Sequence, residues 1–450
     1  LSVPYCLFVK DPRKGFLLFL LEASLLEGPW KVFTYGLNLK LLVYIVRDLL
    51  LYATFLNFYA NRSRVLEPEL LRQRIPHIGL ITLFIANIAI QIFNPNGYSL
   101  LNSVAGSRLF WEMIPLYWIG FYLMRDKKYF RILFWVCVFI VIFNSIAAIL
   151  QYNWGLERTS EIANGYRVML YEWRRDYQGT IRPPALGPDM GFAGYFFSEI
   201  IAMFIALFFI VLKFTNETYK RRTVLIFLIF AALVSISGLI VSLARSALVL
   251  TIIFTLTYLW LLRKAFNKKF IRASIFVGII LFLSTSFLSG KFEAGTERFE
   301  SVKNPKELIE TILHTEGGRF IQAFIVPFSH ATQFFMGNGM GKVGSGAGLF
   351  SKGEACQINA ENDLNLSLAE IGFIGTMIWI IFHFVIIKEG LGIFKRLHNT
   401  QWQWYLAVPL SYIITLLTFW QFGHLTLFPQ NSGFWFMSGV IMAFRHIEDE

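Results

Sequence analysis

The chain contains a long series of apolar stretches that are almost free of charged residues. Stretches of about 17–25 residues match the roughly 30 Å hydrocarbon core of a bilayer. Continuously apolar sequence favours helices there, because a helix satisfies its own backbone groups, and it disfavours a β-barrel, whose strands alternate in polarity. We therefore predict an all-α polytopic membrane protein with about twelve transmembrane helices. The candidate spans are 16–27, 37–59, 77–94, 108–124, 131–151, 191–213, 223–241, 246–262, 272–290, 364–388, 402–421 and 430–446.

Basic residues are distributed unevenly between the two ends of these spans. The net charge of +12 would by itself also suit a nucleic-acid-binding protein. More than half of the Lys and Arg residues, however, lie on the short connections of one side, whereas the short connections of the other side (28–36, 95–107 and 422–429) hold only Lys31. Because cytoplasmic loops are enriched in Lys and Arg, the N-terminus is predicted to be cytoplasmic. The net charge then reflects topology, and no nucleic-acid partner is expected.

Cysteine, metal and targeting patterns exclude several other classes of protein. Cys6, Cys137 and Cys356 form no CxxC pair, so neither a disulfide scaffold nor a zinc site is expected. DxD and HExxH patterns are absent, and we expect no metal and no cofactor. No small-residue cleavage site follows the apolar stretch after residue 16, which we interpret as a short first span. Without internal repeats, residues 1–450 are predicted to form a single transmembrane domain.

Two connections on the outward side are much longer than the others. They cover residues 152–190 and 290–363, and both contain amphipathic patterns at helical spacing (YRVMLYEWRRDY and PKELIETIL). Long loops in compact proteins usually carry function. We therefore predict two outward-facing loops with short helices, the larger of which carries the site.

Three arginines near the outward ends of spans are candidates for binding an anion, because arginine in or beside an apolar span is costly to place. Arg245 lies at a tight turn between two spans, Arg182 precedes a proline-rich approach to a span, and Arg319 follows Gly317-Gly318 before an apolar run. The planar guanidinium suits bidentate binding of phosphate oxygens. The alternatives are a turn-capping or snorkelling arginine at 245, an ordinary loop arginine at 182 and a solvated helix-terminal arginine at 319.

The large loop ends in a glycine-rich run and a carboxylate. The run GNGMGKVGSGAG, from 337 to 348, lacks the GxxxxGK[ST] order of a phosphate loop, so we expect a flexible loop that encloses substrate. Glu361 precedes an apolar span, where partial desolvation favours a general base; a helix N-terminal carboxylate is the alternative. His314 and His330 are rival bases. Glu370 and the pair Arg47/Asp48 are expected to be buried structural partners.

Four sequence patterns occur together in a characteristic order. Glu361-Asn362 is followed by DLNLSLAEI and then by Gly372-Phe-Ile-Gly375, and Arg319 is followed by an apolar run and Gly337-Asn-Gly339. Arg245 stands at a span boundary in ARSALVL, and Arg182 stands in IRPPALGPDMG. In these patterns, over most of its length, the chain resembles the O-antigen ligase and O-antigen polymerase superfamily of bacterial envelope glycosyltransferases, of the GT-C class. The ligases have histidine at the position of Glu361, which favours a polymerase.

The resemblance implies a polysaccharide polymerase in the bacterial inner membrane, with its site facing the periplasm. The donor would be a glycan on undecaprenyl pyrophosphate and the acceptor a glycan or glycolipid, with a chain-length regulator as a further partner. It implies that Arg245 and Arg319, supported by Arg182, bind the pyrophosphate without a metal, and that Glu361 deprotonates the acceptor hydroxyl in an inverting displacement. The substrate-binding residues it implies are Asn362, Gly318, Gly337 and Gly339. A ligase acting on lipid A-core is the alternative, and a flippase of a lipid-linked glycan is the alternative of another class.

Overall fold

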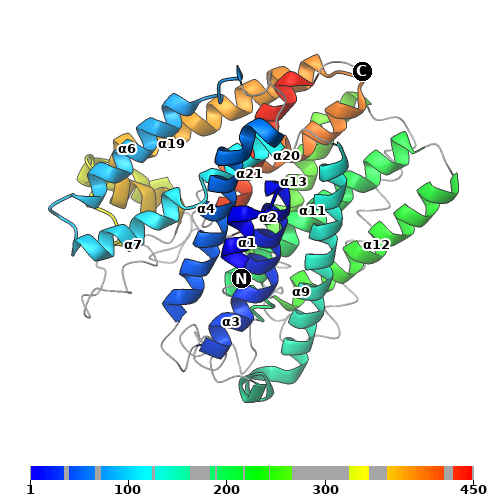
Figure 1. Cartoon of the computed structure of the whole chain (residues 1–450), viewed down its shortest axis with the longest axis horizontal. Coiled ribbons are helices and arrows are strands. Elements are labelled where there is room, and N and C mark those ends of the chain that lie inside the picture. Colours follow the sequence, from blue (N-terminus) through cyan, green and yellow to red (C-terminus); the bar gives the residue numbers. More distant parts are fainter. Residues whose placement is uncertain are drawn as a thin grey trace.

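The computed structural model describes residues 2–34, 40–65, 72–123, 127–162, 183–187, 190–215, 218–242, 244–265, 324–343, 362–419 and 429–447 (Figure 1). All regular structure in these residues is helical. The N-terminal helices are α1 (Ser2–Phe8), α2 (Pro12–Leu21), the π-helical η1 (Glu22–Leu26), α3 (Glu27–Thr34), α4 (Lys40–Val65), α6 (Ile78–Ile92), α7 (Leu100–Trp111), α8 (Pro115–Leu123) and α9 (Lys127–Ile162). They are followed by α11 (Met190–Phe214), α12 (Thr218–Val241), α13 (Arg245–Leu261), η3 (Arg263–Ala265), α17 (Val326–Gln333), α19 (Asp363–Arg396), α20 (Gln401–Phe419), α21 (Gln430–Ala443) and η5 (Phe444–His446).

The predicted spans coincide with helices wherever the structure describes them. Only 272–290 lies outside the described residues. The span predicted at 108–124 is interrupted, because a turn at 112–114 separates α7 from α8. The loop predicted at 152–190 begins later than expected, because α9 continues to Ile162. Within α9, Gly155 has a non-helical conformation.

Four of the described helices are long and apolar enough to cross a membrane: Ile132–Gly155, Phe192–Phe214, Arg221–Val241 and Asp363–Arg396. Two shorter helices, Ile78–Ile92 and Ser246–Leu261, are also apolar. This composition indicates membrane association, as expected for a polytopic protein.

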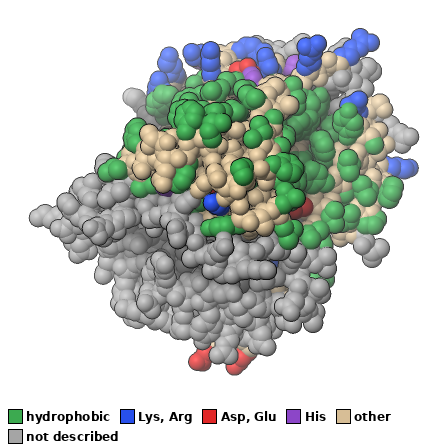
Figure 2. Space-filling model, turned by 90° about the vertical axis from the view of Figure 1, so that its left-hand side faces the viewer, with side chains coloured by type: hydrophobic (Ala, Val, Ile, Leu, Met, Phe, Trp, Pro, Cys, Tyr) green, Lys and Arg blue, Asp and Glu red, His purple; other side chains and the backbone are tan. Residues whose placement is uncertain are grey.

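The basic residues gather at one end of the helices. Figure 2 shows Lys and Arg side chains along the upper end of one face, above a belt of hydrophobic side chains. The chain direction agrees, because α11, α13 and α19 each end next to basic residues: Lys213, Arg263 and Arg396, respectively. We call this the basic end, and the opposite end, where these three helices begin, the site end.

Close backbone contact holds the centre of the molecule together. Gly120 of α8 and Gly439 of α21 face each other so closely that a Cβ atom on either would overlap the backbone of the other helix. Small residues at such crossings allow helices in membranes to approach closely. Beside this pair, α6 and α19 run together as a slanted pair, with α17 packed against α19 near its start (Figure 1).

Candidate functional site

The structure describes only part of the predicted site. Glu361, Arg319, Arg182 and Gly318 lie outside the described residues. Asn362, Gly337 and Gly339 are described in full, and Arg245 is described through its backbone as the first residue of α13.

Helix α19 is interrupted at Gly372, which has φ 73° and ψ 178°. An uninterrupted helix would join the N–H of Phe373 to the carbonyl of Ala369. Instead, the N–H of Phe373 donates to the carbonyl of Phe335 at 3.0 Å, and the carbonyl of Ala369 accepts from the N–H of Asn338 at 2.9 Å. The segment 335–341, which we call the glycine loop, thus inserts into the helix and satisfies both freed backbone groups.

The glycine loop is also held from the side of α6 and α7. The amide of Gln91 donates to the carbonyl of Met336 at 2.6 Å, and the amide of Asn94 donates to the carbonyl of Gly337 at 3.2 Å. On α7, Asn102 donates to the carbonyl of Gly341 at 2.6 Å. The loop therefore joins α19 to α6 and α7, two consecutive helices that lie far from α19 in the sequence.

The prediction of a flexible loop is wrong for residues 337–341. Gly337, Gly339 and Gly341 have positive φ values of 82°, 88° and 73°. An added Cβ would collide with neighbouring backbone at Gly337 and Gly341 and would lie tightly against Gly97 at Gly339. Met340 is fully buried. The glycines allow tight packing and left-handed turns rather than mobility. Gly337 lies against Gly372, and Gly339 lies against Gly97.

Asn362 caps α19 and is buried. Its side-chain oxygen accepts the N–H of Asn365 at 2.9 Å, which satisfies one of the unpaired donors at the helix start. The cap gives Asn362 a structural role, and the substrate-binding role implied by the resemblance stays a prediction.

His330 of α17 packs close to this helix start. The backbone of Asn365 forms a hydrogen bond with its ring, and the buried Nδ1 has no hydrogen-bond partner among the described residues. Burial lowers the pKa of His330, and the backbone contact offsets only part of that effect. Because its ring is neutral and lies close to the start of α19, His330 remains a rival to Glu361 as the general base. His314 lies outside the described residues.

The residues that follow Arg182 are firmly anchored. The side chain of Gln151 forms two hydrogen bonds of 2.9 Å with the backbone of Ala185, and the N–H of Leu186 donates to Asn144 at 3.0 Å. The carbonyl of Leu186 accepts from the N–H of Gly28 at 3.2 Å. Residues 183–187 thus form a buried bridge between α9 and α3, consistent with the predicted stiff approach to Arg182.

The tight turn predicted at Arg245 is present between α12 and α13. It packs against α11, where Gly194 lies so close to Ala244 that a side chain would collide. The hydroxyls of Tyr195 and Ser246 are 3.2 Å apart. The backbone of Arg245 is thereby fixed at the site end, beside the start of α11.

The sequence interpretation missed Glu199, the one acidic residue in the apolar helix α11. Its carboxylate accepts a hydrogen bond of 2.9 Å from the hydroxyl of Tyr412 on α20, and both residues are buried. A carboxyl group inside an apolar span is a functional candidate by default, which is the signal that was overlooked. Glu199 lies one helical turn after Tyr195, on the face of α11 that meets Tyr412 of α20.

Replacing Tyr412 with phenylalanine is expected to lower stability by about 1–3 kcal/mol, because a buried carboxyl oxygen loses its hydroxyl donor. Thermal unfolding of the purified protein in detergent measures this loss. The matched control is Tyr258→Phe, which removes a weaker hydrogen bond of 3.3 Å to the carbonyl of Ala206 and should cost less. Equal losses of stability in the two variants would show that the hydrogen bond from Tyr412 to a carboxyl group stabilises the protein no more than the bond from Tyr258 to a backbone carbonyl.

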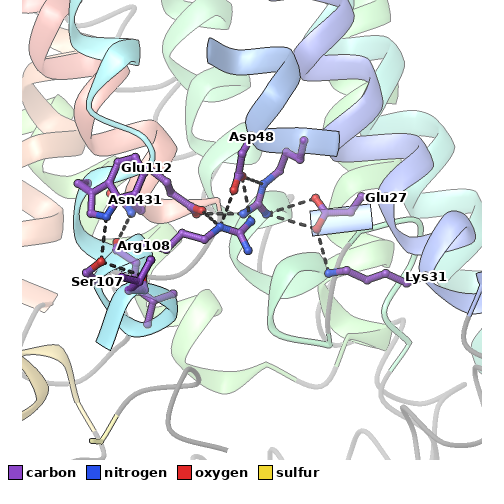
Figure 3. A network of polar contacts seen from close by, with 11 residues as sticks. Glu27, Lys31, Asp48, Ser107, Arg108, Glu112 and Asn431 are labelled. Atoms are coloured by element: carbon purple, nitrogen blue, oxygen red, sulfur yellow. Dashed lines mark hydrogen bonds and ion pairs between the residues drawn. The ribbon is translucent and has the colours of Figure 1, made fainter. Parts of the chain in front are cut away.

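A second feature of the interior is a cluster of six charged residues from α3, α4 and α7 (Figure 3). Arg47 lies 3.3 Å from Glu27, 2.9 Å from Glu112 and 3.5 Å from Asp48. Arg108 contacts Asp48 and Glu112 at 2.6 Å, and Lys31 contacts Glu27 at 2.9 Å. We call this the charge cluster; its three basic and three acidic side chains balance.

The prediction that Arg47 and Asp48 are structural partners is confirmed, although only Arg47 is buried and Asp48 is partly exposed, and both belong to a larger set than expected. Arg108 of α7 and Glu112, which directly follows α7, join the set, and α7 also supports the glycine loop through Asn102. Glu370 is likewise fully buried and accepts the N–H of Val343 at 2.9 Å, as expected for a structural carboxylate. The charge cluster and the glycine loop are therefore linked through one short helix.

Among the described residues, no group of His, Cys, Asp and Glu side chains is suited to hold a metal ion. No protein-family model, no curated protein and no solved structure matches the chain.

Proposed function

We propose that this protein is a membrane-embedded polysaccharide polymerase that transfers glycan repeat units from undecaprenyl pyrophosphate to an acceptor sugar hydroxyl. The observation that carries the proposal is the contact between two of the motifs on which the resemblance rests. Gly337 of the Gly-Asn-Gly turn lies against Gly372 of the Gly-Phe-Ile-Gly motif, and backbone hydrogen bonds join the two segments. Residues singled out separately in the sequence thus form one structural unit.

The arrangement of helix starts supports the proposed chemistry. Arg245 begins α13, Asn362 caps α19, and residues 183–187 precede α11. These three helices all end at the basic end. Arginines at 182, 245 and 319 would bind the pyrophosphate and stabilise the charge that builds on the leaving group. Glu361 would take the proton from the acceptor hydroxyl as that oxygen attacks the anomeric carbon, and the configuration would invert.

One observation favours the transporter alternative. Helix α19 is discontinuous, and interrupted helices often form substrate sites in transporters. In this protein, however, the interruption is filled by the glycine loop, whose backbone groups pair with those of the helix. We therefore interpret the interruption as a packing device and rank the polymerase first.

Replacing Glu361 with glutamine is expected to reduce chain growth by about 100-fold or more, because glutamine cannot accept the proton. The assay combines purified protein, lipid-linked repeat units and EDTA, and measures glycan length on gels. Growth that survives the substitution, or that requires a divalent ion, would contradict the mechanism. Loss of growth in His330→Gln, with growth retained in Glu361→Gln, would reassign the base.

The matched control is Glu389→Gln on α19, at the basic end, where Glu389 pairs with His77 and Arg445. This variant should keep full activity. The product separates the alternatives: longer glycans indicate a polymerase, glycan on lipid A-core indicates a ligase, and unchanged substrate on the other leaflet of a vesicle indicates a flippase.

A further inference from the structure

The segment around α17 exposes an unusual number of large apolar side chains. Phe328 is 77 % exposed, and Phe324, Ile325, Phe335 and Met336 are also exposed. This segment was expected to lie in an outward aqueous loop, where such a group of apolar side chains would be unfavourable. Large exposed apolar patches usually mark a surface that contacts a partner or a membrane.

The exposed apolar surface of α17 is continuous with that of α19. The ring of Phe335 stacks on that of Phe373, with centroids 5.5 Å apart and an angle of 18° between the rings. Phe373 and Ile374 are themselves exposed, and they open the second, membrane-length part of α19. The surface of a candidate span therefore extends without a break onto the glycine loop and α17.

The same surface continues onto α6. Gln91 of α6 donates to the carbonyl of Met336, which places the exposed end of α6 beside the glycine loop. Ile90 and Phe93 at this end are 67 % and 75 % exposed. Two apolar helices, α6 and α19, thus flank the patch, and both expose apolar side chains along their length.

Helix α17 exposes polar side chains as well as apolar ones. Ser329, Thr332 and Gln333 are exposed, whereas Pro327 and His330 are buried toward α19. A short helix that exposes both apolar and polar side chains is typical of segments that lie in the plane of a membrane interface.

We propose that α17 lies in the membrane interface at the site end, with Phe324, Ile325 and Phe328 inserted among lipid acyl chains. The occupant of the patch is the bilayer itself, because the patch continues the apolar surface of two helices of membrane-spanning character. Burial of these side chains in lipid removes their apolar surface from water, which is the driving force for insertion.

This placement has a consequence that rests on the proposed function. The glycine loop follows α17 directly, and its backbone is fixed to α19. A donor whose pyrophosphate sits at the membrane surface would then meet the predicted site without leaving the bilayer. The insertion of α17 can nevertheless be tested without any measurement of activity.

The experiment places a fluorescent nitrobenzoxadiazole label on single cysteines introduced by Phe328→Cys and, as a second position, Ile325→Cys. Labelled protein is reconstituted into phosphatidylcholine vesicles with or without lipids that carry a doxyl quencher near the headgroup. Labels at 325 and 328 are expected to be quenched at least about twofold more by doxyl lipid than by aqueous iodide. The unsubstituted protein, treated in the same way, gives the background from its native cysteines.

Gln333→Cys, about 140° around the same helix from Phe328, is the matched control, and its label should show the reverse order of quenching. The proposal is overturned if the labels at 325, 328 and 333 are all quenched mainly by iodide. Size-exclusion profiles identify any variant that does not fold, and the two apolar positions make the result independent of either one. Inactive protein with lipid-quenched labels would reject the polymerase and leave the insertion of α17 intact.

Discussion

Replacing Arg47 with methionine is expected to destabilise the folded protein by about 3–5 kcal/mol, the usual effect of removing one partner from a buried ion cluster. Arg47 is buried and contacts all three acidic residues of the charge cluster. Without it, Lys31 and Arg108 face three carboxylates, so one buried negative charge remains uncompensated. Thermal unfolding followed by size-exclusion chromatography in detergent measures the loss.

Two further variants separate charge balance from loss of packing. Arg445→Met removes a more exposed arginine, 3.6 Å from Glu389, and should cost less than about 1 kcal/mol. Adding Glu112→Gln to Arg47→Met restores neutrality within the cluster and should recover about 1 kcal/mol or more. If the double variant is less stable than Arg47→Met alone, charge balance does not stabilise this cluster.

The helices were predictable because a bilayer-length apolar stretch is a local property of the sequence. The helix starts at Arg245 and Asp363 lie within one residue of the predicted positions 246 and 364, and the cap at Asn362 marks the second of them. The interruption between α7 and α8 was not predicted, because residues 108–124 are apolar on both sides of the turn.

The contacts of the candidate site were not predictable, because they join residues far apart in the chain. The spacing of Gly372 and Gly375 is visible in the sequence, but the residue types alone do not show that Gly372 leaves the helical conformation. That conformation depends on Phe335 and Asn338, which replace the broken hydrogen bond. The charge cluster likewise depends on Arg108 and Glu112, whose partners on α4 come from 60 or more residues earlier in the chain.

Glu199 is a different kind of omission. A single carboxylate in FFSEIIAMF was visible in the sequence, and the cost of placing it in an apolar span was sufficient reason to select it. Its partner Tyr412, more than 200 residues away, was beyond any local pattern.

Gly372→Ala is expected to disrupt the interrupted helix more than any other glycine substitution in α19. With φ 73° and ψ 178°, Gly372 occupies a region that is essentially restricted to glycine, at a cost of about 1–3 kcal/mol for other residues. A Cβ atom there would also overlap the backbone N of Gly337, and backbone cannot rotate away as a side chain can. We expect a loss of several kcal/mol (about 3 or more) in thermal unfolding, as the glycine loop is expelled from the break.

Two other glycines separate the sources of this loss. Gly155 has a similar backbone conformation (φ 70°, ψ −172°), but an added Cβ would meet nothing within 4 Å, so Gly155→Ala reports the backbone strain alone. Gly392 lies in the regular part of α19 with nothing within 4 Å, and Gly392→Ala should stabilise by up to about 1 kcal/mol. The difference between Gly372→Ala and Gly155→Ala therefore measures the contact between the two glycine motifs. If the two variants lose the same amount of stability, the contact between the two glycine motifs contributes little to stability. That contact would then no longer support the proposed function.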